Sequence, residues 1–285
     1  MQEKIAVVTD STSDLTKKEL EKYDITSIPL KVIYSDSQFH DRVDITPAEV
    51  YESFEREIPT TSMPSPQEIM DVYNELKEEG YTHIISIHIS SGLSATYSNC
   101  MMVADQIEGI EVEVIDSKML SKGLGRLVLY ANNLIKNEDL SFNEIIEKVE
   151  AQKDKIEVLF VVETLKYLKK GGRIGKVSGT IAEFLNIKPI IAIDEEGEYF
   201  TFDKVRGRKR SLKKMYSIIK DKVQDGKEYV VDVMNAAAEE EAHSLLDKFK
   251  QLSQVKETYF SEISPVMVVH TGPGLIGVVL TEIEK

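Results

Sequence analysis

The sequence has few of the features that mark secreted, membrane-bound or nucleic-acid-binding proteins. It contains a single cysteine, Cys100, which excludes a disulfide bond within the chain. Its apolar runs are all shorter than a membrane-spanning helix requires. The first apolar stretch, Ile5 to Val8, is too short for a secretory signal, so we expect a cytoplasmic protein. Basic residues are outnumbered, 35 against 49 acidic ones, and the net charge of −14 disfavours nucleic acid as a partner.

The glycine-rich fingerprint of dinucleotide-binding folds is also missing after the first predicted strand, Ile5–Thr9. This weakens a dinucleotide-binding interpretation, and we expect no cofactor. The polar segment Asp10–Asp14 stands there instead, and its side chains bond readily to nearby backbone. The pattern is typical of a loop that leads into a helix.

A buried strand is predicted at Thr82–Ile89, and it ends in the loop Ser90-Ser91-Gly92. A helix follows from about Ser94, and Cys100 falls within it as a buried thiol. A strand that leads through serine and glycine into a helix N-terminus presents free backbone N–H groups and hydroxyls to an anion. The alternative is that Ser91 or Ser94 only caps the helix.

Three helices in the first half begin at capping boxes, in which a serine or threonine precedes a glutamate by three residues. Proline at the first helical position supports two of them. These helices are predicted at Pro47–Glu57, Pro66–Glu79 and Phe142–Lys153. Further helices are expected at Leu15–Tyr23 and Lys122–Lys136, and strands at Thr26–Tyr34 and Val112–Ile115. Pro29 favours an edge position or a bulge in its strand.

This alternation of strands and helices predicts a parallel sheet with helices on its faces. In such sheets, ligands bind beyond the carboxyl ends of the strands. Three polar segments fall at such ends, namely Asp10-Ser11, Ser90 to Ser94 and Asp116-Ser117. We therefore expect a polar ligand site at this edge of the sheet.

The sequence of the second half predicts a mixed sheet with helices. Near the start of this half, Gly171-Gly172 is expected to end a helix. A hairpin joins two of its strands across a glutamate and glycine turn. The predicted strands are Val158–Val162, Lys188–Asp194, Tyr199–Val205, Tyr229–Val233, Thr258–Phe260, Val266–Val269 and Ile276–Leu280, and the helices are Leu212–Gln224 and Glu239–Leu252. The fold class is therefore α/β with two α/β domains, which we place at residues 1–160 and 161–285.

Six short motifs, in order along nearly the whole chain, resemble signatures of the DegV family. They are D-S-T-S-D-L at Asp10–Leu15, T-T-S-M-P-S-P at Thr60–Pro66, I-S-S-G-L-S-A-T-Y at Ile89–Tyr97, D-S-K at Asp116–Lys118, L-K-K-G-G-R-I at Leu168–Ile174 and H-T-G-P-G at His270–Gly274. The sequence departs from the family pattern at Ala95, where glycine is usual. An added methyl group there could shift the loop and change the geometry around a bound carboxylate.

The resemblance implies a protein that binds one long-chain fatty acid between its two domains and has no catalytic residues of its own. It is similar to the FakB-type subunit of bacterial fatty acid kinase, whose ATP-binding partner phosphorylates the bound carboxylate for phospholipid synthesis. Transient contact with a membrane fits such a role. Matched residue by residue, the motifs imply that the carboxylate lies near Thr61, Ser62, Ser94, Arg173 and His270.

The chemistry of these residues suits the implied ligand. Hydroxyls and backbone N–H groups bind a carboxylate without permanently neutralising its charge, as a site that later presents it to a kinase requires. The tail requires an apolar slot, in which each buried CH₂ contributes about 0.8 kcal/mol. Residues such as Ile28, Met119 and Leu124 fit such a slot and the core equally well. Neither the chain length nor the unsaturation of the fatty acid can be read from the sequence.

A serine hydrolase acting on an acyl ester is the alternative function. Ser94, His270 and Asp10 could form a triad, although the residues around Ser94 lack the last glycine of a nucleophile elbow. A metal site is not expected, because His83, His88 and His270 are scattered along the chain.

The segment Lys204–Lys214 is strongly basic within an acidic protein, with seven Lys or Arg residues. The resemblance implies that Arg206, with Arg208, docks an acidic surface of the kinase subunit, where clustered charge speeds the encounter. The alternative is a solvated turn and helix start without a partner. Nucleic acid binding is disfavoured, because no aromatic residues for base stacking are interleaved with the charges.

Overall fold

The structure is a computed structural model that describes residues 3–137, 139–180 and 186–283. Its first half holds a parallel four-stranded sheet in the order β2-β1-β6-β7, as the alternation of elements predicted. The strands are β1 (Ile5–Asp10), β2 (Ile25–Ile28), β6 (His83–His88) and β7 (Glu111–Asp116). The predicted strand Thr26–Tyr34 is broken at Pro29, which lacks an N–H for the ladder, and its second part joins another sheet.

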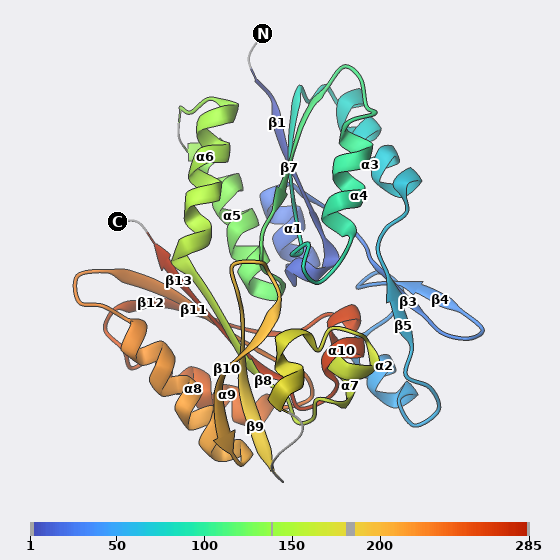
Figure 1. Ribbon diagram of the computed structural model, residues 1–285. Helices are drawn as coiled ribbons and strands as arrows, with labels where there is room; N and C mark the ends of the chain where they lie inside the picture. Colours follow the sequence, from blue (N-terminus) through green and yellow to red (C-terminus); the bar gives the residue numbers. More distant parts are fainter. Residues whose placement is uncertain (1–2, 138, 181–185, 284–285) are drawn as a thin grey trace.

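That second part, β3 (Lys31–Ile33), is the middle strand of a small antiparallel sheet that the sequence did not predict. Its neighbours are β4 (Gln38–His40) and β5 (Thr60–Ser62). In Figure 1 this sheet projects to one side of the molecule. It matters for function because β5 carries Thr60, Thr61 and Ser62, the first three residues of the motif Thr60–Pro66.

Helices cover both faces of the first sheet, and three of them begin at the predicted capping boxes of Thr46, Ser65 and Ser141. A fourth capping box, at Thr16, starts α1. The helices of this half are α1 (Lys17–Tyr23), α2 (Pro47–Ser53), α3 (Pro66–Glu78), α4 (Thr96–Ala104), α5 (Ser121–Asn137) and α6 (Phe142–Gln152). Short 3₁₀ helices lie at Ser11–Ser13, Lys153–Lys155 and Gly175–Thr180.

The second half is built on a mixed six-stranded sheet in the order β10-β9-β8-β13-β11-β12, in which only β11 and β12 pair in parallel. The strands are β8 (Ile156–Val161), β9 (Ile187–Ile193), β10 (Tyr199–Arg206), β11 (Glu228–Asn235), β12 (Val255–Glu262) and β13 (Ile276–Ile283). The helices are α7 (Lys166–Lys170), α8 (Arg208–Lys222), α9 (Glu239–Phe249) and α10 (Pro265–Thr271). The predicted hairpin is formed by β9 and β10. The parallel sheet of the first half and the mixed sheet of the second half confirm the predicted α/β class.

One predicted element is wrong: Val266–Val269 is not a strand but the middle of helix α10. Four consecutive apolar residues fit a buried helix as well as a buried strand, and these four are buried on all sides. The deciding signal stood just before them. Ser264 is the N-cap, its side chain accepts from Met267 N, and Pro265 takes the first helical position.

The largest hydrophobic core lies between the two sheets and continues from one half of the chain into the other. Val7 of β1, Leu124 of α5, Phe160 of β8 and Val279 of β13 all belong to it. Two smaller cores lie beneath α3 and α4 and beneath α8 and α9. The division into domains at residue 160 stays a prediction, while the change of sheet itself falls between β7 and β8. No helix in the described ranges combines the length and the apolar character needed to cross a bilayer.

Candidate functional site

The three polar segments predicted at strand ends do meet at one edge of the parallel sheet. Asp10 accepts a hydrogen bond at 2.9 Å from the backbone N of Ile89, where β6 ends. On the other side of β6, Asp116 accepts from the backbone N of Ser91 at 3.1 Å. Carboxylates from β1 and β7 therefore hold the intervening serine loop in place.

Beneath this loop, a chain of buried polar groups fixes the end of β6. His88 Nδ1 lies 3.0 Å from Asp10 Oδ2, and its Nε2 lies 2.7 Å from Ser86 Oγ, which contacts Tyr73 OH at 2.8 Å. Burial favours the neutral ring, but Cys100 and Asp10 outweigh it and raise the pKa of His88 to about 10. Cys100 is buried, as predicted. These side chains are already fully engaged, which makes them structural support for the loop.

Ser94 is half-buried at the entrance of α4, which begins two residues later than its predicted start. Its Oγ lies 2.9 Å from Thr96 Oγ1 and accepts from Thr96 N at 3.3 Å, so the hydroxyl does help to cap the helix. Ala95 is the N-cap residue with φ −78° and ψ 7°. The negative φ means that this position does not require glycine for its backbone conformation.

The second hydroxyl segment, β5, is held against α10 from the other half of the chain. Thr61 Oγ1 lies 2.7 Å from His270 Nε2 across 209 residues of sequence. Ser62 follows on the same strand and is half-buried. Asn99 of α4 donates to the carbonyl of Pro64 at 2.8 Å and so ties this segment to the helix behind Ser94.

His270 combines a polar role with an apolar environment. Burial and the nearby Arg173 guanidinium lower the pKa of His270 to about 4, so the ring is neutral at neutral pH. Its second nitrogen, Nδ1, is buried and finds no hydrogen-bond partner among the described residues. This nitrogen faces Gly171, where any Cβ atom would overlap with it.

The segment Lys170–Arg173 touches all three parts of the site. Lys170 Nζ donates to the carbonyl of Ile58 at 3.3 Å, just before β5. Gly171 packs on His270. Arg173 donates from Nε to the carbonyl of Leu93 at 3.1 Å, beside Ser94, and from Nη1 to the carbonyl of Gly171 at 2.7 Å. This segment thus connects the strand of Thr61 and Ser62, the helix of His270 and the loop before Ser94, which the spacing of these residues in the sequence does not predict.

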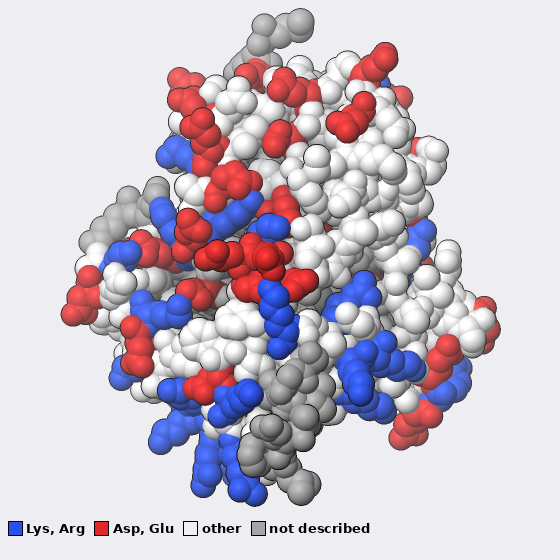
Figure 2. Space-filling view, viewed as in Figure 1, with Lys and Arg blue, Asp and Glu red and all other residues white. Residues whose placement is uncertain are grey.

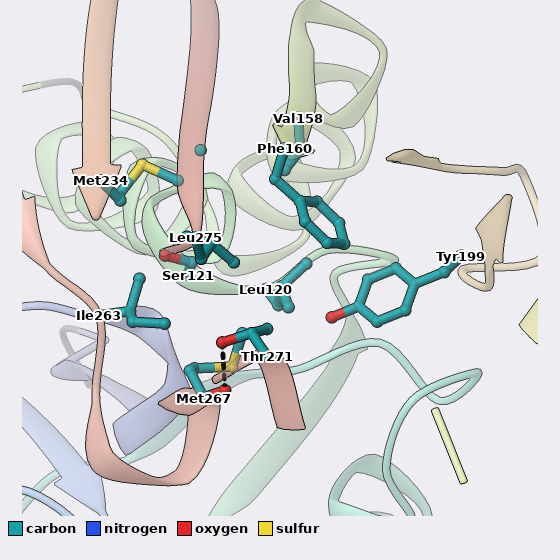
Figure 3. A pocket seen from close by; sticks show the side chains of 11 residues that line it. Leu120, Ser121, Val158, Phe160, Tyr199, Met234, Ile263, Met267, Thr271 and Leu275 are labelled. Atoms are coloured by element: carbon teal, nitrogen blue, oxygen red, sulfur yellow. Dashed lines mark hydrogen bonds between the residues drawn. The ribbon is translucent and has the colours of Figure 1, made fainter. Parts of the chain in front are cut away.

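An apolar cavity of about 20 Å³ lies beside α10, between the mixed sheet and the start of α5. Figure 3 shows Phe160, Tyr199, Met234 and Leu120 converging on it, with Thr271 and Met267 of α10 forming its floor. Its lining residues are Leu120, Ser121, Val158, Phe160, Tyr199, Met234, Ile263, Met267, Thr271, Leu275 and Gly277. Thr271 directly follows His270, so the polar cluster and the apolar cavity share one helix.

The arrangement does not favour the hydrolase alternative. In the described part of the chain, His270 Nε2 is paired with Thr61 and its Nδ1 has no partner, so no carboxylate orients the ring. Asp10 is bonded to His88 instead, and Ser94 to Thr96. The three members of the predicted triad therefore have other partners.

The three histidines considered as metal ligands also lie apart, each beside a different side chain. His83 lies near Glu111, His88 near Asp10 and His270 near Thr61. Among the described residues, one acidic group, Asp194, Glu196 and Glu198, has the spacing of a metal site, but the Lys176 ammonium pairs with all three carboxylates.

Comparison with known proteins decides the family. The model of the DegV family matches residues 4–282. The chain belongs to the DegV family. A DegV domain-containing protein of Clostridium acetobutylicum is 46% identical over 281 residues, which cover 98% of this chain and 99% of the relative.

Solved structures of similar proteins have the same fold. One, described by its fatty acid binding, is a DegV family protein from Thermus thermophilus with a TM-score of 0.93 and 30% identity, covering 98% of this chain and 100% of that one. A stearic acid-binding protein from Eubacterium ventriosum matches with a TM-score of 0.86 and 28% identity, covering 97% and 98% of the two chains.

In this DegV family chain, the basic segment Lys204–Lys214 forms the end of β10 and the start of α8, a strand-to-helix turn as predicted. Arg206 is exposed beside Lys209 and Arg210 and lines a surface hollow with them. Arg208 points inward: it donates to Glu241 at 2.7 Å and to the carbonyl of Gly274 at 2.7 Å. Arg208 therefore anchors α8, and docking stays a prediction carried by Arg206.

Sequence reasoning missed the residues that position α10. Asp14 and Asp41 are buried, and they accept from the backbone N of Ser264 at 2.8 Å and of Val266 at 3.0 Å. Arg42 donates to Asp14 at 2.7 Å. Asp14 belongs to the motif Asp10–Leu15, but Asp41 lies outside the six motifs, and neither position reveals its partner in the sequence.

Proposed function

We propose that this DegV protein binds one long-chain fatty acid, with its carboxylate at Thr61, Ser62 and Ser94 and its tail in the cavity beside α10. The observation that carries the proposal is the 2.7 Å contact between Thr61 and His270 on the helix that also lines the apolar cavity. The fatty acids bound by its structural neighbours support it.

The electrostatics of the cluster suit a carboxylate. Arg173 supplies a positive charge near His270, while the imidazole stays neutral because its pKa is about 4. Hydroxyls of Thr61 and Ser94 can add hydrogen bonds to the anion, each contributing about 1.5–3 kcal/mol to a charged acceptor. Because Arg173 is engaged with two backbone carbonyls, it attracts the carboxylate without enclosing it in a bidentate pair.

The tail must enlarge the cavity to enter it, because about 20 Å³ holds little more than one water molecule. Met234 and Met267 line the space, and their unbranched side chains change conformation easily. Each CH₂ transferred from water contributes about 0.8 kcal/mol, so a long tail offsets this rearrangement. The cavity thus favours a flexible chain over a rigid ligand.

We further propose that the protein is not itself an enzyme but presents the carboxylate, in the cytoplasm, to an ATP-dependent fatty acid kinase subunit that forms an acyl phosphate for phospholipid synthesis. Arg206 would dock this partner, since it is exposed and borders Lys209 and Arg210 in a chain of net charge −14. Figure 2 shows Lys and Arg side chains gathered at the lower end of the molecule, where Figure 1 draws β10 and α8.

A pair of neighbouring threonines tests the fatty-acid site. Thr61→Val removes the hydroxyl that faces His270, whereas Thr60→Val removes an exposed one at the other face of β5. In calorimetric titrations of delipidated protein with fatty acid, we expect Thr61→Val to weaken binding about tenfold or more and Thr60→Val to change it less than about twofold. No binding by the wild-type protein, or equal effects of the two changes, would contradict the proposal.

The partner is tested with Arg206→Ala in an assay with an added kinase subunit, Lys18→Ala serving as a control on exposed α1. Arg206→Ala should leave fatty-acid content unchanged and slow acyl-phosphate formation at least about tenfold, with a wild-type rate that falls as salt rises. Normal turnover and apparent affinity of Arg206→Ala would sink the docking proposal and leave the fatty-acid site standing.

A further inference from the structure

Three lysines of α7 form a basic face beside the head-group site. Lys166, Lys169 and Lys170 are spaced i, i+3 and i+4, so they share one side of the helix, and all three are exposed. Tyr167 and Leu168 are buried and anchor the other side. Within residues 3–137, 139–180 and 186–283, none of the three lysines forms an ion pair with a carboxylate. Figure 2 shows basic side chains where Figure 1 places α7.

This face is joined directly to the site. Lys170 Nζ is held at 3.3 Å from the carbonyl of Ile58, three residues before Thr61. An ammonium has three N–H donors, and this contact uses one of them. The next residue, Gly171, packs on His270. The C-terminal end of α7 therefore adjoins the cluster that holds Thr61 and His270.

The charge of the ligand changes in the reaction under the proposed function, on which this inference rests. A carboxylate oxygen attacks the γ-phosphorus of the nucleoside triphosphate held by the kinase subunit and forms an O–P bond. The bond from that phosphorus to the leaving nucleoside diphosphate breaks, and its electron pair leaves with the diphosphate. The head group then carries a phosphoryl group of about −2 charge instead of a carboxylate of −1. Its three new oxygens call for cationic donors besides Arg173, which is already engaged with two backbone carbonyls.

We propose that Lys169 and Lys170 form a phosphoryl-binding subsite that retains the acyl phosphate on this protein after transfer. Both ammonium groups lack a carboxylate partner in the described chain, and Lys169 directly precedes the segment Lys170–Arg173 that contacts the site. Because both are exposed, they leave the carboxylate itself to Thr61, Ser94 and Arg173. The subsite thus distinguishes product from substrate.

A stable mimic tests this without the kinase. Hexadecyl phosphate has the C–O–PO₃ linkage of an acyl phosphate, and hexadecanoate represents the substrate. Both are titrated into delipidated wild-type protein, into the double variant Lys169→Gln/Lys170→Gln, and into Lys17→Gln/Lys18→Gln. The last pair removes the same charge from exposed neighbouring lysines on α1.

The double variant at α7 should bind hexadecyl phosphate about tenfold more weakly and lose most of this difference at high salt. Its affinity for hexadecanoate should fall much less, because glutamine at position 170 keeps an N–H donor for the carbonyl of Ile58. The α1 variant should match the wild type for both ligands. An unchanged affinity of the α7 variant for hexadecyl phosphate, or an equal loss for both ligands, overturns the subsite. Failure of the wild type to bind hexadecanoate overturns instead the proposed function.

Discussion

Gly171 and Gly172 are neighbours that lack side chains for different reasons. Space around Gly171 is taken by the imidazole of His270, whereas Gly172 has φ +72° and no atom within 4 Å of a Cβ position. Gly171→Ala should displace His270, reduce fatty-acid affinity about tenfold and destabilise the fold by about 1–3 kcal/mol through overpacking. Gly172→Ala should cost about 1 kcal/mol of backbone strain and leave the affinity unchanged. Urea unfolding and ligand titration of both variants separate the two effects, and equal affinities would contradict the role given to Gly171.

The neutral His270 gives the second prediction at this scale. Its pKa is lowered to about 4 in the folded protein against about 6.5 when unfolded, so the unfolded chain takes up the proton first as pH falls. Its contribution to stability is present above pH 6.5 and is lost as pH falls toward 4. As the pH falls from 7 to 5, the melting temperature of His270→Gln should therefore drop less than that of the wild type. His243→Gln, on the exposed side of α9, is the control and should follow the wild type. Parallel curves for wild type and His270→Gln would contradict a buried neutral ring.

Contacts between residues that are far apart in the chain could not be predicted from the sequence. Thr61 and His270 are 209 residues apart and meet only because the two halves fold against each other. No spacing rule predicts such a pair, and only the family resemblance named both residues. The inward position of Arg208 was equally hidden, because its partners Glu241 and Gly274 lie in other elements.

At the scale of elements, local signals predicted what local physics determines. The capping boxes at Thr46, Ser65 and Ser141 set the first residue of three helices, because a cap acts within one turn. Val266–Val269 was misassigned because its environment is apolar on all sides, and periodicity carries no information there. Strand β5 was missed because three residues pair only where β3 is already in place.

The position of α10 depends on Asp14, which is buried and accepts from Arg42, from Ser264 N and from Ser121. Asp14→Asn leaves these donors without a charged acceptor and should destabilise the protein by about 2–4 kcal/mol. It should also weaken fatty-acid binding, since α10 carries His270 and the cavity floor. Asp36→Asn, which changes an exposed carboxylate, is the control. Denaturant unfolding that shows the same stability for both variants would refute this role of Asp14.

At the scale of the whole molecule, a buried ion pair joins the two halves. Arg126 of α5 donates to both oxygens of Asp232 on β11, at 2.6 and 2.8 Å, and Asp232 is only 1% exposed. Removing Arg126 alone leaves the buried carboxylate of Asp232 without its partner and should lower the free energy of unfolding by about 3–5 kcal/mol. The double change Arg126→Met/Asp232→Leu should cost much less than the sum of the single changes. Additive losses in chemical denaturation would show that the pair does not couple the halves.

The central claim is that the protein binds one fatty acid, with its head group at the Thr61–His270 cluster and its tail in the cavity. The mass of the purified protein tests this claim most directly. Native mass spectrometry of freshly purified protein should give the chain mass plus that of one long-chain fatty acid, and the increment should disappear under denaturing conditions. Added fatty acid should raise the melting temperature of the delipidated protein. A mass of the bare chain alone, together with no thermal shift on adding fatty acid, would contradict the account.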